Sequence, residues 1–310
     1  QWTVDPRVAG STPVALPMVH TMLLEWSSFV QKVREFFTAR GYLEVHTPTL
    51  LPYPNIDLNV EPVEVKVIEC GKELRRWLQT SPEFSMKKLL SSHRRDIFQV
   101  AKVFRNGECG PLHRVEFTML EWYKVGADYG YLIREIGELL LFLGIAQSYK
   151  VTRLEHAFEE HAGVILSEEE EVFKNNLLAY GYQFDDRESW EELFFRIYIQ
   201  VERKLGLQEP EFITHFPRRL SSYAKVREGY AERFELYIKG VEVANGWTEE
   251  TDAEEVRRRM EEYRAGRDLP LDEELLKAYQ NFPPCAGCSI GLDRLFMVRM
   301  GLKSLEELYF

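Results

Sequence analysis

The segment from Val103 to Lys124, VFRNGECGPLHRVEFTMLEWYK, limits the possible folds most, because a polar, glycine-containing loop separates two strand-like runs. If residues 115–125 form a strand, successive side chains point to opposite faces, so Phe117, Glu121 and Tyr123 share one surface. A carboxylate buried beside aromatic rings is costly unless a cation meets it. The segment therefore predicts two strands and a carboxylate that requires a cation.

A second strand pair, FELYIKGVEVAN, gives a more defined geometry. A two-residue turn at Lys239-Gly240 would place Tyr237 opposite Glu242 and Glu235 opposite Ala244. Glu235 and Glu242 would then be diagonal neighbours on one face, about 7–8 Å apart between backbones. Two such carboxylates can bind one Mg²⁺ together with phosphate oxygens, or they can both be solvated. The geometry by itself leaves both interpretations open.

Two arginines occupy positions suited to a nucleotide. In GLDRLF, Gly291 permits a strand-to-helix joint and places Arg294 in the first helical turn, where it can stack on a flat ring or bind phosphate. The alternative for Arg294 is a salt bridge to Asp293 or to a surface carboxylate. Arg105 precedes NGECG and has the same two interpretations; NGECG is not a Walker-type phosphate loop. Together with the paired glutamates, these features suggest a nucleotide site.

Glu83 has a purely structural interpretation. It follows Thr80 by three residues, which is the spacing of a helix capping box. The local sequence alone therefore gives Glu83 no role in binding.

Strand-like and helix-like segments follow one another without the regular βαβ order of a parallel sheet. The sequence therefore predicts an α+β fold with a largely antiparallel sheet flanked by helices. The expected elements are an amphipathic helix over 26–37, a strand and a helix within 72–90, strands at 95–105 and 115–125, an acidic, mostly helical region at 128–210, strands within 232–246, a surface helix at 252–266, and a strand, a glycine joint and a helix within 287–301.

The overall composition excludes several classes of protein. The formal net charge of -11 argues against a general nucleic-acid binder, and 45% hydrophobic and 13% aromatic residues argue against disorder. Lys87-Lys88, Arg94-Arg95 and Arg218-Arg219 are basic spots that we interpret as solvated. No signal peptide or membrane-spanning run is evident, and CAGC lacks a second metal-type pair, which favours close packing and a cytoplasmic protein with reduced thiols.

Taken together, three segments resemble the class II aminoacyl-tRNA synthetase catalytic core, specifically its lysine branch, from about residue 20 to the end. GYLEVHTP is similar to the first motif, with Pro48 at the dimer contact; FRNGECGPLHRVEFTMLEWY is similar to the second, and GCSIGLDRL to the third. TSPEFSMKKLL, EFTMLEWY and GVEVANGWTEETDA resemble the elongation factor P lysyl/β-lysyl ligases, which are truncated relatives of lysyl-tRNA synthetases.

The resemblance implies ATP and Mg²⁺ as ligands and assigns roles by position. Arg105 and Arg294 would be the catalytic arginines, with Arg105 holding the substrate carboxylate and the α-phosphate. The remaining ATP contacts would be Glu108, His113 at the outer phosphates, Phe117 stacking with Arg294 on adenine, and the metal ligands Glu235 and Glu242. The amino-acid site would be lined by Glu83, Glu121, Tyr123, Asn245, Glu249 and Ser289. The missing cation would then be the ammonium of a lysine-like substrate, bound by charge-assisted hydrogen bonds.

Two positions depart from the family pattern. Lysyl-tRNA synthetases have glutamate where this chain has Gly107, with Glu108 next to it. Ser289 stands where those synthetases have glycine and the elongation factor P ligases have alanine. The sequence therefore leaves the choice between α-lysine and (R)-β-lysine open.

The resemblance also implies a domain organisation and an acceptor. Residues 1–19 would be an extension and residues 20–310 a catalytic domain without the anticodon-binding barrel, which argues against tRNA. The predicted function is ATP-dependent activation of lysine or (R)-β-lysine as an acyl-adenylate, followed by transfer to a lysine side chain of elongation factor P, by a homodimer. The alternatives are charging of tRNA or of another small acceptor, and a non-catalytic amino-acid-binding paralogue.

Overall fold

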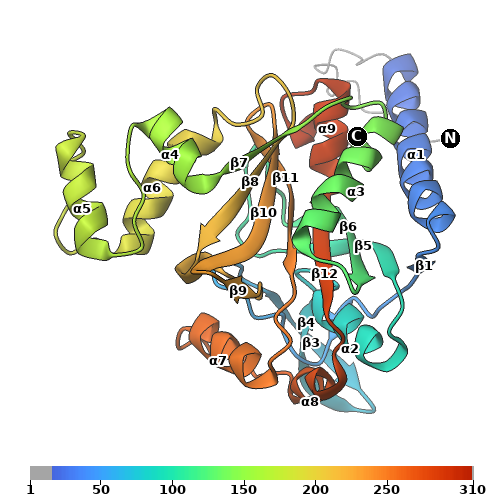
Figure 1. Ribbon diagram of the computed structural model, residues 1–310. Helices are drawn as coiled ribbons and strands as arrows, with labels where there is room; N and C mark the ends of the chain where they lie inside the picture. The colour runs from blue at the N-terminus through green and yellow to red at the C-terminus, as the bar shows by residue number, and fades with distance from the viewer. Residues whose placement is uncertain (1–15, 309–310) are drawn as a thin grey trace, which may run out of the picture.

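A largely antiparallel sheet of nine strands forms the centre of the computed structural model, which describes residues 16–308 (Figure 1). Among the strands of the described residues, only the pairs β1–β5 and β7–β8 are parallel, so the predicted α+β class is confirmed. Along the sheet the strands are β1 (Leu43–Glu44), β5 (Ile97–Phe104), β6 (Glu116–Val125), β12 (Cys285–Gly291), β11 (Val241–Thr248), β10 (Tyr230–Ile238), β8 (Glu211–Pro217) and β7 (Lys150–Arg153), with β9 (Val226–Arg227) paired to β10.

Three helices cover one face of this sheet: α1 (Leu16–Ala39), α3 (Tyr129–Phe142) and α9 (Leu292–Met300). The predicted stripe of α1 is buried at Phe29, Val33, Phe36 and Phe37, against strand residues such as Trp122. Burial of this stripe confirms the predicted amphipathic helix. Of the predicted extension 1–19, residues 1–15 lie outside the described residues.

A helical lobe extends from the β7–β8 edge and consists of α4 (Leu154–Ala162), α5 (Glu170–Ala179) and α6 (Trp190–Glu202) (Figure 1). Its core stacks aromatic rings, with Trp190 and Phe194 at 5.1 Å between centroids. Ser189 caps α6 in a reciprocal capping box with Glu192. The acidic run 168–171 lies on its surface, as predicted.

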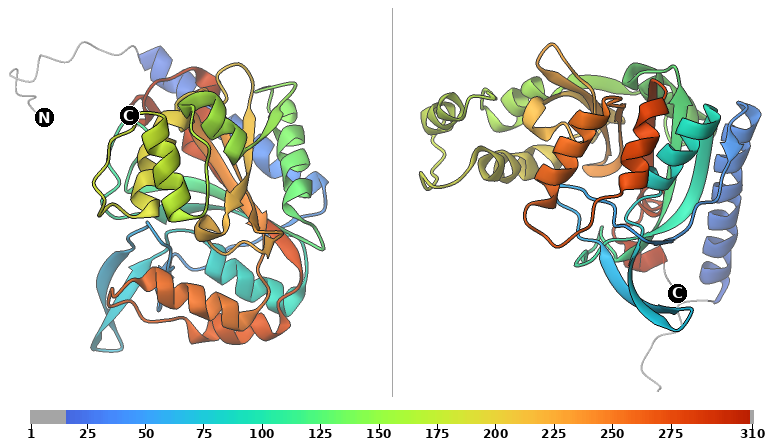
Figure 2. Two further views of the ribbon diagram at one scale, coloured as in Figure 1. Left: turned by 60° about the vertical axis from the view of Figure 1, so that its left-hand side comes forward. Right: turned by 90° about the horizontal axis from the view of Figure 1, so that it is seen from below.

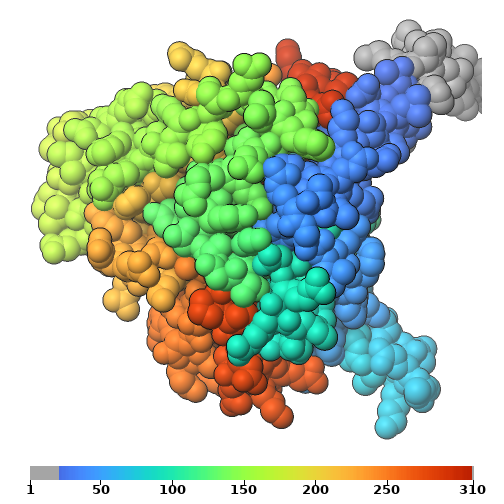
Figure 3. All heavy atoms as spheres, turned by 45° about the vertical axis from the view of Figure 1, so that its right-hand side comes forward, coloured from blue at the N-terminus to red at the C-terminus, as the bar shows by residue number. Residues whose placement is uncertain are grey.

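The opposite face of the sheet is covered at one end by α2 (Glu83–His93), α7 (Ala253–Arg264) and α8 (Glu273–Ala278), which lie together in Figure 2. A small antiparallel sheet of β2 (Leu50–Leu51), β4 (Lys72–Leu78) and β3 (Val63–Glu69) adjoins them, and its β3–β4 hairpin protrudes in Figure 3. Within residues 16–308, short 3₁₀ turns lie at Arg218–Leu220, Tyr279–Asn281 and Leu305–Leu308.

Within residues 16–308, the structure has no helix that combines the length and the apolarity needed to cross a bilayer.

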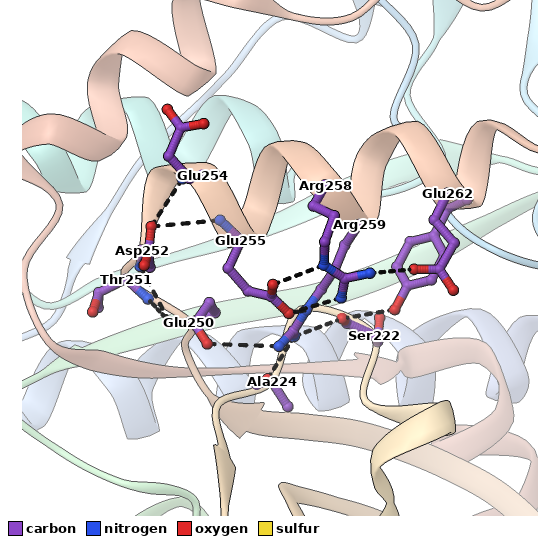
Figure 4. A network of polar contacts seen from close by, with 11 residues as sticks. Ser222, Ala224, Glu250, Thr251, Asp252, Glu254, Glu255, Arg258, Arg259 and Glu262 are labelled. Atoms are coloured by element: carbon purple, nitrogen blue, oxygen red, sulfur yellow. Dashed lines mark hydrogen bonds and ion pairs between the residues drawn. The ribbon is translucent and has the colours of Figure 1, made fainter.

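Helix α7 departs from the predicted surface helix at Arg259, which is only 3% exposed. Arg259 donates to the backbone oxygens of Ser222 and Ala224 at 3.0 and 2.6 Å, and to the Glu255 carboxylate at 2.8 Å (Figure 4). Its second Nη lies 3.6 Å from Glu250. Arg259 therefore ties α7 to the loop before β9 and to the segment that follows β11.

Replacing Arg259 with leucine tests this anchor. The change would leave two carbonyls and two carboxylates without their buried cation, so we expect the free energy of unfolding to fall by about 2–4 kcal/mol in denaturant titrations. Arg258→Leu is the matched control, because Arg258 lies on the exposed side of the same helix and pairs with Glu255 and Glu262. That change should cost less than about 1 kcal/mol. Equal losses in the two variants would contradict the anchoring role.

Candidate active site

A row of polar residues crosses the sheet on the face opposite α1, α3 and α9. The strand register pairs Gln99 with Glu121, Glu121 with Ser289, Ser289 with Asn245, and Asn245 with Glu235. Residues paired in register point to the same face of a sheet. Five strands therefore bring side chains that are distant in sequence into one line.

The hairpin of β10 and β11 confirms one prediction and corrects another. Lys239 and Gly240 form the two-residue turn, both with positive φ. Glu235, however, pairs with Asn245 rather than with the predicted Ala244, because a bulge shifts the register between Leu236 and Tyr237. The extra residue lies in β11, and every side chain of β11 after it points to the opposite face from the one that regular alternation predicts. The bulge therefore places Asn245 on the face of both glutamates.

The two glutamates of this hairpin differ in environment. Glu235 accepts hydrogen bonds from Arg233 at 2.5 Å, Tyr198 at 2.8 Å and Tyr237 at 2.7 Å. Glu242 keeps 37% of its side chain exposed and lies 3.9 Å from Arg294. Desolvation, followed by the charge of Glu235, raises the pKa of Glu242 to about 7. A cation at Glu242 would offset both effects.

These oxygen donors fit a divalent cation of the Mg²⁺ type, which takes one or two carboxylates plus ligand oxygens. Residues 16–308 contain no cluster of three or more histidine, cysteine, aspartate or glutamate side chains suited to a metal. A metal here would therefore complete its coordination with oxygens from a bound ligand or water.

An arginine-containing cleft lies next to the hairpin. Arg294 donates to the backbone oxygens of Leu112 at 2.9 Å and Glu242 at 3.1 Å, and it also lies 3.9 Å from the Glu242 carboxylate, which agrees with the predicted alternative of a salt bridge to a part-exposed carboxylate. The Arg105 guanidinium lies 5.2 Å from the Phe117 ring centroid. The cleft is lined by Arg105, Glu108, His113, Phe117, Glu242 and Arg294, and Glu235 lines the adjoining cavity.

His113 lies in this cleft, close to both arginines. Burial, together with the charge of Arg294, lowers the pKa of His113 below its usual value. The neutral imidazole is therefore favoured at neutral pH, and an anion bound next to it would favour its charged form.

A smaller, acidic pocket joins this cleft, because Arg105, Asn245 and Ser289 line both. All six residues predicted for the amino-acid site line it: Glu83, Glu121, Tyr123, Asn245, Glu249 and Ser289. The structure therefore brings the predicted residues of both sites together, while the role of each residue stays a prediction.

Glu121, the carboxylate that requires a cation, is buried in this pocket. Its oxygens accept hydrogen bonds from Ser81 at 2.5 Å and from Tyr123 at 2.7 Å. Burial, and then the charge of Glu83, raises the pKa of Glu121 to about 8. Both donors are neutral hydroxyls, so the negative charge of an ionised Glu121 has no direct counter-ion among the described residues.

Lys87 was missed as the partner of two pocket residues, and its predicted solvation is wrong. It is fully buried, and its Nζ lies 2.6 Å from Glu83 Oε1 and 2.7 Å from Glu249 Oε2. Its spacing of three residues from both Phe84 and Leu90 was the available signal, because it places Lys87 on the inward stripe of α2.

The predicted Thr80–Glu83 capping box is also wrong. Helix α2 has Pro82 at its N-cap, and the Glu83 backbone N–H donates to Ser81 Oγ at 3.0 Å. The side chain of Glu83 is then free to turn inward to Lys87 instead of capping its own helix.

Gly287 leaves room for two of the pocket residues to approach its backbone. A Cβ at this position would lie 2.3 Å from the Tyr123 ring and 2.7 Å from Glu249 Oε1. Among the described residues, neither buried oxygen of Glu249 accepts a hydrogen bond of good geometry; Lys87 Nζ lies 2.7 Å from Oε2, and the Trp247 side chain is a further nearby donor. Because Glu249 lines the acidic pocket, this incompletely satisfied carboxylate is suited to a hydrogen-bond donor from a ligand.

The cysteines of CAGC flank this glycine and pack into different cores. Cys285 packs among the residues that bury Tyr123 and Tyr279, whereas Cys288 packs with Trp122 on the other face of β12. The prediction of close packing is therefore confirmed.

A largely antiparallel sheet whose open face joins an arginine-containing cleft to an acidic pocket is the catalytic core of a class II synthetase. Residues 15–310 match the family of class II tRNA synthetases (D, K and N). The elongation factor P–(R)-beta-lysine ligase homolog of Aquifex aeolicus (strain VF5) is 54% identical over 289 residues, which cover 93% of this chain and 99% of that protein. The elongation factor P–(R)-beta-lysine ligases of Avibacterium paragallinarum and Pectobacterium carotovorum (strain PC1) are 38% and 37% identical, with 92% of this chain and 93% of each relative covered.

The chain belongs to the class II tRNA synthetase family (D, K and N) and, within it, to the elongation factor P–(R)-β-lysine ligase group. It is therefore a ligase of the class II synthetase type.

Gly287→Ala tests the tight geometry of the pocket. The new methyl group would displace Tyr123 and Glu249, so we expect the free energy of unfolding to fall by about 1–3 kcal/mol in denaturant titrations. Gly291→Ala is the control on the same strand, because its Cβ would meet only the Arg294 side chain, at 3.9 Å. That variant should stay within about 0.5 kcal/mol of wild type. A Gly287→Ala protein of unchanged stability would show that the pocket is wider or more adaptable than described.

Proposed function

We propose that this protein activates a lysine-type amino acid with ATP and transfers the acyl group to a lysine side chain of elongation factor P. The observation that carries this proposal is the joining of the two pockets: an acidic one suited to ammonium groups, and an arginine-containing one suited to phosphates, with Arg105 at their junction. The names of the relatives support the same substrate and the same acceptor.

In the first step, a carboxylate oxygen of the amino acid attacks the α-phosphorus of ATP, and the bond to the pyrophosphate oxygen breaks. Arg105 lines both pockets, so its guanidinium is placed to hold the substrate carboxylate against the α-phosphate. Arg294 is fixed by two backbone carbonyls and faces the cleft that Phe117 also lines, which suits stacking on adenine. Positioning and electrostatic stabilisation would supply the rate, since none of these side chains needs to form a covalent intermediate.

Magnesium, held by Glu242 and Glu235, would neutralise charge on the phosphates. Glu235 is already oriented by Arg233, Tyr198 and Tyr237, whereas Glu242 is open to the cleft. His113, near Arg294, would contact the outer phosphates.

In the second step, the acceptor amine attacks the acyl carbon of the adenylate, AMP leaves, and the amine loses a proton. The substrate's ammonium groups would contact Glu83, Glu121 and Glu249, with Tyr123 and Asn245 as polar partners. Ser289 stands between Glu121 and Asn245 in the sheet register, where its side chain limits the width of the pocket. We propose (R)-β-lysine as the favoured isomer, because the relatives carry that name.

We further propose that residues 20–310 act as one catalytic domain, that the protein works as a homodimer in the cytoplasm, and that tRNA is not its acceptor. Exposed apolar side chains at Leu43 and Leu50 flank the exposed Pro48, which supports a dimer contact at this segment. The net charge of -11 disfavours tRNA binding.

Mass spectrometry of elongation factor P tests the proposed acceptor and isomer. We expect incubation with this protein, ATP and (R)-β-lysine to add one acyl group at a lysine of the factor, with α-lysine giving a smaller yield. Omission of ATP should abolish the product. Labelling of tRNA with an unmodified factor would refute the acceptor, and an equal yield with both isomers would refute the preference.

Glu249→Gln tests the role of the carboxylate that lines the acidic pocket beside Gly287. Loss of its charge should weaken the charge-assisted contact by about 1.5–3 kcal/mol, which is roughly a 10- to 100-fold rise in the KM for the amino acid in ATP–pyrophosphate exchange. ATP binding, measured separately, should change little. Glu254→Gln, an exposed change on α7, is the control. An unchanged KM in Glu249→Gln would place this carboxylate outside the substrate contacts.

A further inference from the structure

Lys87 is a buried ammonium in contact with two glutamates that line the acidic pocket, and nothing in the function proposed above assigns it a role. It lies on α2, and its Nζ contacts one oxygen of Glu83 and one oxygen of Glu249. The rings of Tyr223 and Trp247 lie 5.3 and 5.9 Å from the same atom, within the range of a cation–π contact.

The position of Lys87 leaves part of each carboxylate's charge for a ligand. On Glu249, which lines the acidic pocket, Lys87 contacts Oε2, while Oε1 lies beside Gly287 without a hydrogen bond of good geometry among the described residues. Glu83 likewise gives only one oxygen, Oε1, to Lys87. A single internal cation therefore orients two carboxylates toward one cavity.

The charges of the pocket then favour a cationic substrate. With Glu83, Glu121 and Glu249 all ionised and Lys87 charged, two negative charges stay uncompensated within this group, and Asp57 adds a further carboxylate to the lining of the same pocket. A lysine-type amino acid carries two ammonium groups, while its own carboxylate has Arg105 at the junction of the pockets. A buried site is most favourable for the ligand that leaves no unpaired charge.

We propose that Lys87 is a positioning residue that keeps Glu83 and Glu249 ionised and oriented, and that it thereby sets the pocket's preference for a doubly cationic amino acid. This inference rests on the proposed function, because it concerns the amino-acid pocket of that reaction. Lys87 itself would not contact the substrate, because it would act on the substrate only through the two glutamates.

The electrostatic surroundings of Lys87 agree with this role. Burial alone would lower the pKa of Lys87, but the charges of Glu249 and Glu83 raise it well above its usual value. Lys87 in turn opposes the rise in pKa that burial imposes on both glutamates and on Glu121. The titratable groups that interact with Lys87 are Glu83, Glu121, Tyr223, Glu249, Tyr279 and Cys285, and Asp57 acts on Glu83 from the loop before β3.

Lys87→Met tests the proposal, because it keeps the length and apolar stem of the side chain and removes only the charge. Without Lys87, the two glutamates hold protons up to a higher pH, and a protonated carboxyl binds an ammonium weakly. We expect the KM for the amino acid in ATP–pyrophosphate exchange to rise roughly 10- to 100-fold near neutral pH and to recover as the pH is raised. The KM for ATP should stay nearly constant.

Lys88→Met is the matched control on the next residue of α2, because Lys88 is partly exposed and pairs with Asp272, outside the lining of the acidic pocket. It should leave the KM for the amino acid and its pH profile unchanged. A merely structural role of Lys87 would instead lower kcat by the same factor at every pH through a smaller folded fraction. That result, or an unchanged KM, would overturn the proposal.

Wild-type protein provides a second measurement in case Lys87→Met does not fold. Calorimetry of amino-acid binding in two buffers of different ionisation enthalpy gives the number of protons released. With Glu83 and Glu249 already ionised, binding at mildly alkaline pH should release about one proton or fewer, from Glu121. Release of two or more protons would show that the glutamates are protonated in the free pocket and would overturn the proposal. Absence of amino-acid-dependent exchange in the wild type would instead refute the proposed function itself.

Discussion

The burial of three carboxylates in one pocket is the constraint on which the rest of this structure depends. Charged groups withdrawn from water are tolerated only where opposite charges or hydrogen-bond donors replace the lost solvent. Lys87 does this for Glu83 and Glu249, whereas Glu121 has only the hydroxyls of Ser81 and Tyr123. The pocket is therefore stable when empty but incompletely neutralised. That deficit is what a cationic ligand would correct.

The sheet makes this concentration of charge possible because one of its faces packs in the apolar core and the other lines the site. The face toward α1, α3 and α9 buries apolar side chains, such as Leu120 and Ile290, in one continuous core. Their neighbours in the same strands point the other way and include Glu121 and Ser289. Each strand thus contributes both stabilising apolar contacts and a site residue. The stability gained from the apolar face offsets the cost of the charged one.

The sequence predicted those features of the site that depend on neighbouring residues, and it missed those that depend on contacts between distant segments. The alternation of residues in β6 placed Glu121 and Tyr123 on one face, and Lys239-Gly240 defined the turn of the hairpin. Periodicity could not show the bulge that pairs Glu235 with Asn245, because a bulge depends on how the strand packs against both neighbours. The burial of Lys87 was equally hidden, since one of its partners is Glu249, far along the chain. The predicted roles of the site residues came from the family resemblance, and the structure adds where each of these residues lies.

The two pockets are also connected through one strand, β11. Arg294 donates to the backbone carbonyl of Glu242, so a residue of the arginine-containing cleft is tied to the backbone of this strand. Glu242 belongs to the same strand as Asn245, which lines both pockets, and a bulge separates the two residues. The register of β11 with β12 then fixes Asn245 beside Ser289, which also lines both pockets. The relative position of the cleft and the acidic pocket is therefore set by the pairing of these two strands.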